Sequence, residues 1–254
     1  MSGHSKWATI KHKKGAADAK RGRIFSKLAK EIMVIAKQGG GDPNANASLR
    51  NILLKAKSVN MPSDNIDRAI KKGTGELGGA TYEEVSYEGY AAGGVGLIVA
   101  ALTDNKNRAA AEIRNIFKKN GSDFASVGAV SRNFERKGQI IVDAEGVEED
   151  RIMEIALEAG ADDVVNNEGE NFEILCEPGV FPAICEALEK AGIATASAEA
   201  TGLLPLTEVA VSDIAVARAV NKFVNMLEEY DDVQNVYHNM DVDDAIAEQL
   251  AEED

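Results

Sequence analysis

Apolar side chains recur at helical spacing in three successive stretches between residues 24 and 73. The first begins at Ile24 and stops at the glycines of residues 39–41, the second lies before Met61-Pro62, and the third closes at Gly73. Glycine and proline end helices at such points, because glycine accepts the left-handed turn and proline cannot continue the hydrogen bonding. The pattern therefore predicts three short helices. A unit of this kind can be a helix-turn-helix variant, although no recognition helix stands out.

From Thr81 the apolar period changes to two, which is typical of strands. Strands are predicted at residues 82–87, 97–102 and 127–134, with a glycine-rich turn at residues 88–96. The turn joins two strands and no Gly-Lys-Ser/Thr follows it, which excludes a phosphate-binding loop and indicates a hairpin. After residue 202, the patterns at residues 206–211, 213–229 and 233–237 predict a strand, a helix and a strand that complete the same sheet. The acidic residues 241–254 predict a short frayed helix.

Residues 138–202 show a self-contained alternation of strand and helix patterns. The predicted order is βαββαβ, with strands at residues 139–142, 162–165, 172–176 and 193–201, and this order is that of a ferredoxin-like domain. We therefore expect a multidomain α and α+β fold. Its predicted domains are a basic helical domain at residues 1–80, a discontinuous α+β domain at residues 81–137 plus 203–254, and an inserted ferredoxin-like domain at residues 138–202.

The charge is distributed very unevenly along the chain. The formal net charge is −14, yet residues 1–72 hold 16 Lys and Arg against 5 Asp and Glu, whereas the remaining 182 residues hold 12 against 37. A basic head of net charge +11 on an acidic body is typical of proteins that bind nucleic acid or the ribosome. The acidic body would be repelled by the same polyanion and would orient the head toward it.

The basic leader, residues 3–23, carries most of the candidate binding side chains. Cations interleaved with an aromatic and with small residues suit a segment that lies along a polyanion, with phosphates on the cations and a base stacked on the indole. A solvated terminus with one anchored tryptophan is the alternative. The candidate nucleic-acid-binding residues are Lys6, Trp7, Lys11, His12, Lys13, Lys14, Lys20, Arg21 and Arg23, with Lys27 and Arg50 beyond the leader.

The sequence lacks recognisable signatures of catalysis, metal binding or membrane insertion. The three histidines are scattered, and Cys176 and Cys185 fit no zinc or redox spacing, so we expect two buried apolar thiols, no metal and no cofactor. The acidic pair Asp231-Asp232 lies at a predicted turn, where aspartate is favoured for backbone reasons. No apolar run is long enough to span a bilayer and no signal peptide is expected. We predict a cytoplasmic, monomeric non-enzyme without a small-molecule substrate.

Several stretches together resemble the YebC/PmpR family, which includes the mitochondrial translational activator of cytochrome c oxidase. They are Gly-His-Ser-Lys-Trp-Ala-Thr-Ile-Lys-His-Lys-Lys at residues 3–14, Phe-Ser-Lys-Leu-Ala-Lys-Glu-Ile at 25–32, Thr-Asp-Asn-Lys-Asn-Arg at 103–108 and Asp-Val-Gln-Asn-Val-Tyr-His-Asn at 232–239. The resemblance covers nearly the whole chain. It implies a helical N-terminal domain and two α+β domains, one inserted in the other. It also implies nucleic-acid binding without catalysis, either to promoter DNA in transcription or at the ribosome in translation, including relief of stalling at proline runs.

Three hypotheses follow for the function. The first is a regulator that binds duplex DNA with the leader cations on phosphates. The second is a translation factor that uses the same residues on ribosomal or transfer RNA, with Trp7 and His12 contacting bases, which the loop-like leader favours. The third is an acidic scaffold whose basic head docks on a partner protein or on its own acidic domains.

Overall fold

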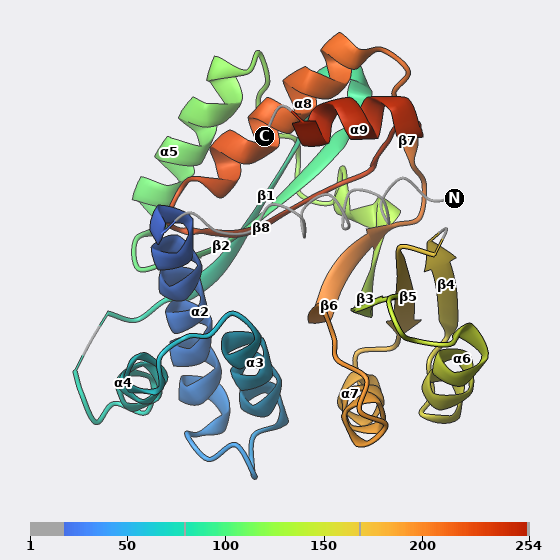
Figure 1. Cartoon of the computed structure of the whole chain (residues 1–254). Coiled ribbons are helices and arrows are strands. Elements are labelled where there is room, and N and C mark those ends of the chain that lie inside the picture. Colours follow the sequence, from blue (N-terminus) through green and yellow to red (C-terminus); the bar gives the residue numbers. More distant parts are fainter. Residues whose placement is uncertain (1–17, 79, 168, 253–254) are drawn as a thin grey trace. The chain divides into compact units, whose positions relative to one another are not determined.

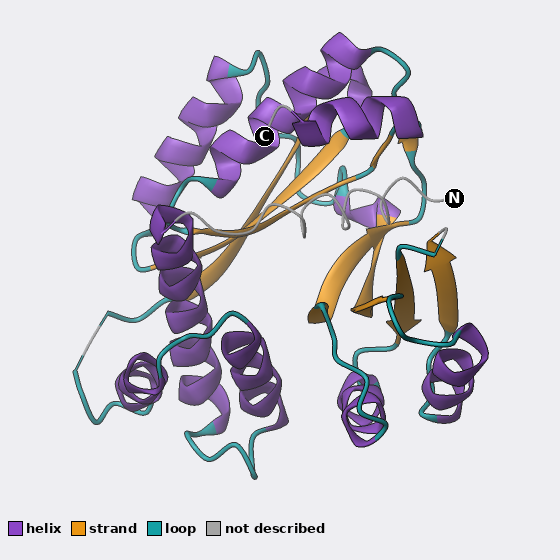
Figure 2. Cartoon of the chain, in the orientation of Figure 1, coloured by secondary structure: helices purple, strands orange, loops and turns teal. Residues whose placement is uncertain are grey.

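The computed structural model describes residues 18–78, 80–167 and 169–252 (Figures 1 and 2). The described residues divide into two compact units. Residues 134–206 form one unit, and the described residues on both sides of that segment form the other. The predicted fold class is confirmed: a helical region is followed by an α+β region, which is interrupted in sequence by a second α+β unit.

The larger unit begins with three helices, α2 (Asp18–Gly39), α3 (Ala47–Ser58) and α4 (Ser63–Gly73), which confirms the three predicted helices. α2 starts six residues before Ile24, so the end of the predicted loop-like leader is helical. α2 and α4 pack so closely at Gly73 that an added Cβ would lie 2.5 Å from the Met33 carbonyl oxygen. Their shared core consists of Leu28, Ile32, Leu49, Ile52, Ala56, Met61 and Ala69.

A three-stranded antiparallel sheet follows, with the order β1-β2-β8. The central strand is the most apolar in sequence and is buried along nearly its whole length. The Phe117 and Phe223 rings of two helices meet edge to face at 4.9 Å, and Figure 1 shows these helices on the same side of the sheet. The elements are β1 (Glu83–Tyr90), β2 (Gly96–Thr103), α5 (Lys106–Lys119), α8 (Ile214–Glu228) and β8 (Val233–His238).

The predicted strand at residues 127–134 is wrong for most of its length. Gly128 has a φ of +82°, and η2 (Ser131–Asn133) is a short 3-10 helix. The Glu88 carboxylate accepts hydrogen bonds from the backbone N–H groups of Gly128 and Val130, at 2.8 and 2.7 Å. A side chain from β1 thus satisfies amides that would otherwise pair with a strand, and this cannot be inferred from the local apolar pattern.

The predicted strand at residues 206–211 is short and joins a different sheet. Only β7 (Val209–Ala210) is extended, and it pairs in parallel with β9 (Met240–Asp241) instead of extending the β1-β2-β8 sheet. The Asn239 side chain, directly after β8, donates a hydrogen bond to the Thr207 carbonyl at 3.0 Å. That contact holds the segment beside the chain that leaves β8.

The C-terminal acidic segment forms α9 (Asp244–Glu252), as predicted, but it is not a frayed helix. Ile246, Ala247 and Leu250 are buried. Figure 1 shows α9 beside α8. Asp244 and Glu248 are exposed and lie on the solvent side of this packed amphipathic helix.

The smaller unit has the predicted βαββαβ order and a four-stranded antiparallel sheet of order β4-β5-β3-β6. This is the ferredoxin-like arrangement. Cys176 is buried, as predicted, whereas Cys185 is only half-buried and packs against the same core. The elements are β3 (Phe134–Asp143), α6 (Glu149–Glu158), β4 (Asp163–Asn167), β5 (Asn171–Cys176), α7 (Phe181–Lys190) and β6 (Ser197–Pro205).

Candidate nucleic-acid interface

The predicted binding residues fall into two groups. Those that lie outside the described residues are Lys6, Trp7, Lys11, His12, Lys13 and Lys14. The others are on two helices of the larger unit: Lys20, Arg21, Arg23 and Lys27 on α2, and Arg50 on α3. Of these, Arg21 and Arg50 are exposed, whereas Arg23 and Lys27 are half-buried. The described part of the predicted interface therefore lies in the three-helix region.

Two lysines of α2 hold the C-terminal end of α8. Lys27 Nζ donates to the Glu228 carbonyl at 3.0 Å, and Lys30 Nζ donates to the Asp231 carbonyl at 2.8 Å. Unpaired carbonyls and the negative end of the helix dipole attract cations at this position. Part of the basic side of α2 thus has an intramolecular role, which joins the three helices to the α+β part of the same unit.

Asp232 completes this connection from the loop between α8 and β8. Its carboxylate pairs with Lys30 Nζ through Oδ1 at 2.8 Å and with Arg108 Nη2 through Oδ2 at 2.8 Å. Thr103 Oγ1 donates to Oδ2 at 2.9 Å, and Tyr230 OH lies 3.3 Å from the same oxygen. The Asp232 side chain is only 7% exposed, so this is a buried, fully hydrogen-bonded carboxylate shared by four elements.

The surroundings of Asp232 favour its ionised form. Burial alone raises its pKa, but the hydrogen bonds from Lys30, Arg108 and Thr103 outweigh burial and lower the pKa to about 2. The same contacts raise the pKa of Arg108, chiefly through Asp232 and then through Tyr230 and Asp104. Asp232 and Arg108 are therefore both ionised at neutral pH.

The turn preference inferred for Asp232 from the sequence is an incomplete account of this residue. Its main contacts are with residues 124 and 202 positions away. A weak local signal does exist, because the spacing of Arg108 and Asp104 predicts a pair one helical turn apart, and the two side chains meet at 2.8 Å. No sequence pattern indicates that the same guanidinium also reaches Asp232.

Arg50 has a local structural role as well as an exposed position. Its Nε donates to the Pro43 carbonyl and its Nη2 to the Asn44 carbonyl, both at 3.2 Å. These bonds hold the loop between α2 and α3. Arg50 therefore presents its charge from a fixed position at the end of the three-helix region.

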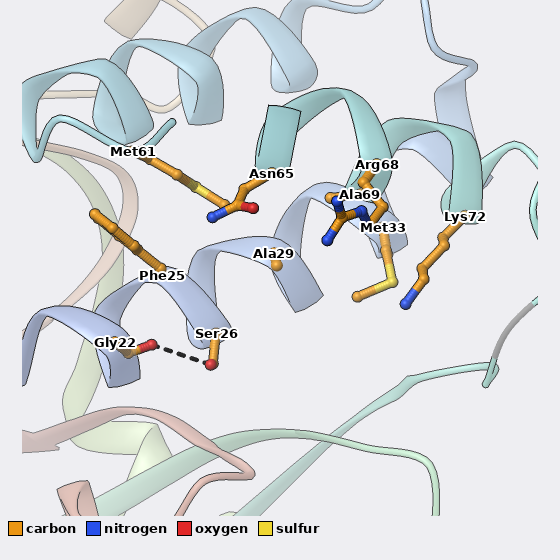
Figure 3. A pocket seen from close by; sticks show the side chains of 10 residues that line it. All are labelled: Gly22, Phe25, Ser26, Ala29, Met33, Met61, Asn65, Arg68, Ala69 and Lys72. Atoms are coloured by element: carbon orange, nitrogen blue, oxygen red, sulfur yellow. Dashed lines mark hydrogen bonds between the residues drawn. The ribbon is translucent and has the colours of Figure 1, made fainter. Parts of the chain in front are cut away.

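A groove of about 330 Å³ runs between α2 and α4 (Figure 3). Side chains from both helices point into it, and Met61 lies near Phe25 and Asn65. Its polar members are Ser26, Asn65, Arg68 and Lys72, and the described residues that line it include no acid. Its apolar surface consists of Phe25, Ala29, Met33, Met61 and Ala69. The sequence placed Arg68 and Lys72 among the charges of the helical region but did not predict a cavity beside them.

Other chemistry is sparse in the part of the chain that the structure describes. No three His, Cys, Asp or Glu side chains among those residues lie together as a metal site requires. Burial raises the pKa of Cys176 to about 11 and that of Cys185 to about 12, which leaves both thiols protonated and weakly nucleophilic. None of the described helices combines the length and the apolarity that crossing a membrane requires.

Comparisons with known proteins agree over nearly the whole chain. The model of the TACO1/YebC protein N-terminal domain matches residues 5–76, and that of the TACO1/YebC second and third domain matches residues 82–240. A "probable transcriptional regulatory protein" of Desulfotalea psychrophila is 53% identical over 252 residues, which is 99% of this chain and 100% of the relative. A protein of Treponema pallidum with the same description is 55% identical over 242 residues, 95% of this chain and 98% of the relative.

The solved structures include a close match in fold. A conserved hypothetical protein of Aquifex aeolicus superimposes with a TM-score of 0.84 at 46% sequence identity, over 94% of this chain and 97% of that one. Both family models, the full-length relatives and this fold lead to one conclusion. The chain belongs to the TACO1/YebC family.

Proposed function

We propose that the chain is a non-enzymatic regulator of gene expression that binds nucleic acid through its basic helical domain, residues 1–80. The observation that carries the proposal is the charge asymmetry: 16 Lys and Arg against 5 Asp and Glu in residues 1–72, on a body of net charge −25. Phosphates would attract the first part and repel the second, which fixes the orientation of binding. The relatives described as probable transcriptional regulatory proteins make promoter DNA the first candidate ligand.

The basic leader would supply most of the phosphate contacts. Lys27 shares its ammonium with the Glu228 carbonyl, so its contribution would be smaller than that of the leader. Arg50 would add a contact from α3, since its guanidinium is already held in place. The principal contacts in this proposal are Lys6, Lys11, Lys13, Lys14, Lys20, Arg21 and Arg23.

One observation favours a second candidate, an RNA-binding factor that acts on ribosomal or transfer RNA. In a helix-turn-helix protein, the N-terminal residues of the second helix contact base edges in the major groove. The corresponding part of α4 carries Asp64 and Asp67, both exposed, and phosphates would repel these carboxylates. RNA that is recognised by its shape or through its single strands needs no such helix.

The salt dependence of binding tests the shared part of both candidates. We would neutralise Lys11, Lys13 and Lys14 to alanine in the full chain and measure affinity for duplex DNA and for RNA at several salt concentrations. The slope of log affinity against log salt should fall by about 0.7–0.9 for each phosphate that the variant no longer neutralises. A matched control neutralises Lys118, Lys119 and Lys222, which are exposed outside the basic domain. An unchanged slope in the leader variant would refute the assignment of its lysines.

Sedimentation separates DNA from the ribosome. The full chain would be centrifuged with ribosomes at physiological salt, with excess duplex promoter DNA as competitor. If the chain sediments with ribosomes despite the DNA, and the leader substitutions abolish this, the RNA candidate is established. If the DNA removes the chain from the ribosomes, the result favours transcription. Point variants suit this test better than deletion of residues 1–73, because deletion would also take Lys30 from Asp232. Gradients without ribosomes would test the inferred monomer.

A further inference from the structure

The groove between α2 and α4 combines an apolar interior with a cationic edge. Phe25, Met33 and Met61 supply polarisable apolar surface, while Arg68 and Lys72 on α4 are exposed at its edge (Figure 3). We propose that this groove holds one unstacked base of a nucleic acid, with the adjoining phosphate on Arg68 and Lys72. The inference rests on the proposed function and deepens it, because it assigns a site to a base instead of to the phosphate backbone alone.

The size of the groove favours a single nucleotide over a larger occupant. A volume of about 330 Å³ is at the lower end of the range for small-molecule sites. A docked helix is about 10 Å wide and needs several turns to bury a useful apolar face. A base is flat and small enough to enter between two helices, and it brings its own phosphate to the edge.

The polar groups of the groove match the chemistry of a base with its phosphate. Aromatic and sulfur-containing side chains stack on the face of any base, whatever its identity. The Asn65 amide offers both donors and an acceptor to a base edge, and Figure 3 shows it directed into the groove from α4. Ser26 Oγ donates to the Gly22 carbonyl at 3.0 Å, which leaves the hydroxyl oxygen able to accept.

The electrostatics favour an anion. Within the part of the chain that the structure describes, neither Arg68 nor Lys72 makes an ion pair, whereas Lys30 and Arg108 both pair with Asp232. The acids of α4, Asp64 and Asp67, are not among the residues that line the groove. The edge of the groove is therefore a local cationic site that a phosphate would satisfy.

The groove also lies near the predicted leader along the chain. Gly22, which lines the groove, is four residues beyond Asp18, the first residue of α2. Four helical residues span about 6 Å. Arg21 and Arg23, two cations of the predicted leader, flank Gly22 in α2, so a strand held by them would pass close to the groove.

The test compares a single-stranded RNA of about ten nucleotides with an abasic strand of the same length, whose phosphates are identical. The intact chain should bind the base-bearing strand about tenfold more tightly, as expected for stacking of a base. This ratio should fall below about threefold in Ala29→Leu and Gly22→Leu, which fill the groove. Gly22→Leu guards against misfolding, because a Cβ there meets nothing within 4 Å and leucine favours a helix.

Charge variants test the edge of the groove separately. Lys72→Ala should weaken binding of the base-bearing strand about three- to tenfold, whereas the matched control Lys71→Ala should change it less than twofold. Lys71 is the exposed neighbour on the same helix and does not line the groove. Equal losses of affinity in both variants would indicate diffuse attraction and would overturn the edge assignment.

Methyl spectra of the methionines locate the bound base. Ring currents should shift the methyl resonances of Met33 and Met61 on addition of the base-bearing strand and not of the abasic strand, while those of Met153 and Met226 stay in place. If the Trp7→Ala substitution shifts the Met33 and Met61 resonances in the absence of any nucleic acid, the groove holds the chain's own leader and the proposal is wrong. Salt-dependent binding of equal affinity for the two strands would refute the groove as a base-binding site while leaving the proposed function intact. No binding of either strand or of duplex DNA would overturn both.

Discussion

Replacing Asp232 with asparagine should destabilise the larger unit while preserving side-chain volume. Its carboxylate is the common partner of Lys30 and Arg108, at 2.8 Å from each. Asparagine keeps one acceptor oxygen, but its NH₂ group would face one of the two cations, donor against donor. The substitution therefore removes a charge and leaves a buried cationic contact unsatisfied.

The lowered pKa of Asp232 gives the magnitude of the expected loss of stability. A fall from 3.8 to about 2 corresponds to roughly 2 kcal/mol of stability at pH 7. Because the folded-state pKa is depressed, this contribution is fully present above about pH 4 and is lost as the pH falls through 2. About 1 kcal/mol should remain at pH 3. Asp232→Asn should accordingly cost about 2–4 kcal/mol at pH 7, and its deficit should shrink on acidification.

Urea unfolding at pH 7 and pH 3 measures this difference. All five tyrosines of the chain, at residues 82, 87, 90, 230 and 237, belong to the larger unit, so tyrosine fluorescence in a Trp7→Phe background reports on that unit. Asp231→Asn is the matched control, because it removes the same charge from the exposed neighbour. A variant as stable as the parent at pH 7, a deficit undiminished at pH 3, or an equal loss of stability in the control would each refute the reasoning.

Three further outcomes follow from buried groups. Hydrogen bonds from backbone amides outweigh burial and lower the pKa of Glu88. Glu88→Gln should therefore lower the free energy of unfolding by about 1–3 kcal/mol at pH 7. Urea midpoints should show this loss of stability becoming smaller as the pH falls below about 4.5. Gly89→Ala should cost about 1–3 kcal/mol, because its Cβ would lie 2.2 Å from Phe117 Cε1; an unchanged melting temperature would mean that the ring moves aside. The Cys176 thiol should react with a disulfide reagent at pH 8 only after unfolding, and reaction of both thiols in the folded protein would contradict its burial.

The order of helices and strands could be predicted from the sequence because it depends on nearby residues. Apolar period and glycine or proline breaks placed the three N-terminal helices, the β1–β2 hairpin and the βαββαβ unit. The exceptions are segments whose backbone is held from a distance. Residues 127–134 carry an apolar pattern, yet the Glu88 carboxylate captures their amides, and β7 is aligned by a contact from Asn239.

Candidate site residues were predictable by type and not by partner. A run of lysines and arginines indicates an interaction with anions, but the sequence does not identify the anionic group that each side chain contacts. In the tertiary structure, Lys27 and Lys30 donate hydrogen bonds to backbone carbonyls at and just after the end of α8, whereas Arg68 and Lys72 line a groove. The groove itself exists only because α2 and α4 pack side by side.

By itself, the sequence determined the helices and most of the strands, the inserted position of the ferredoxin-like unit and the separation of a basic head from an acidic body. Each of these depends on spacing or composition within one stretch of chain. Only the tertiary structure decided that Asp232 binds Lys30 and Arg108, which lie 202 and 124 residues away. Packing brings such partners together, and burial then strengthens every charge interaction by removing water from around it.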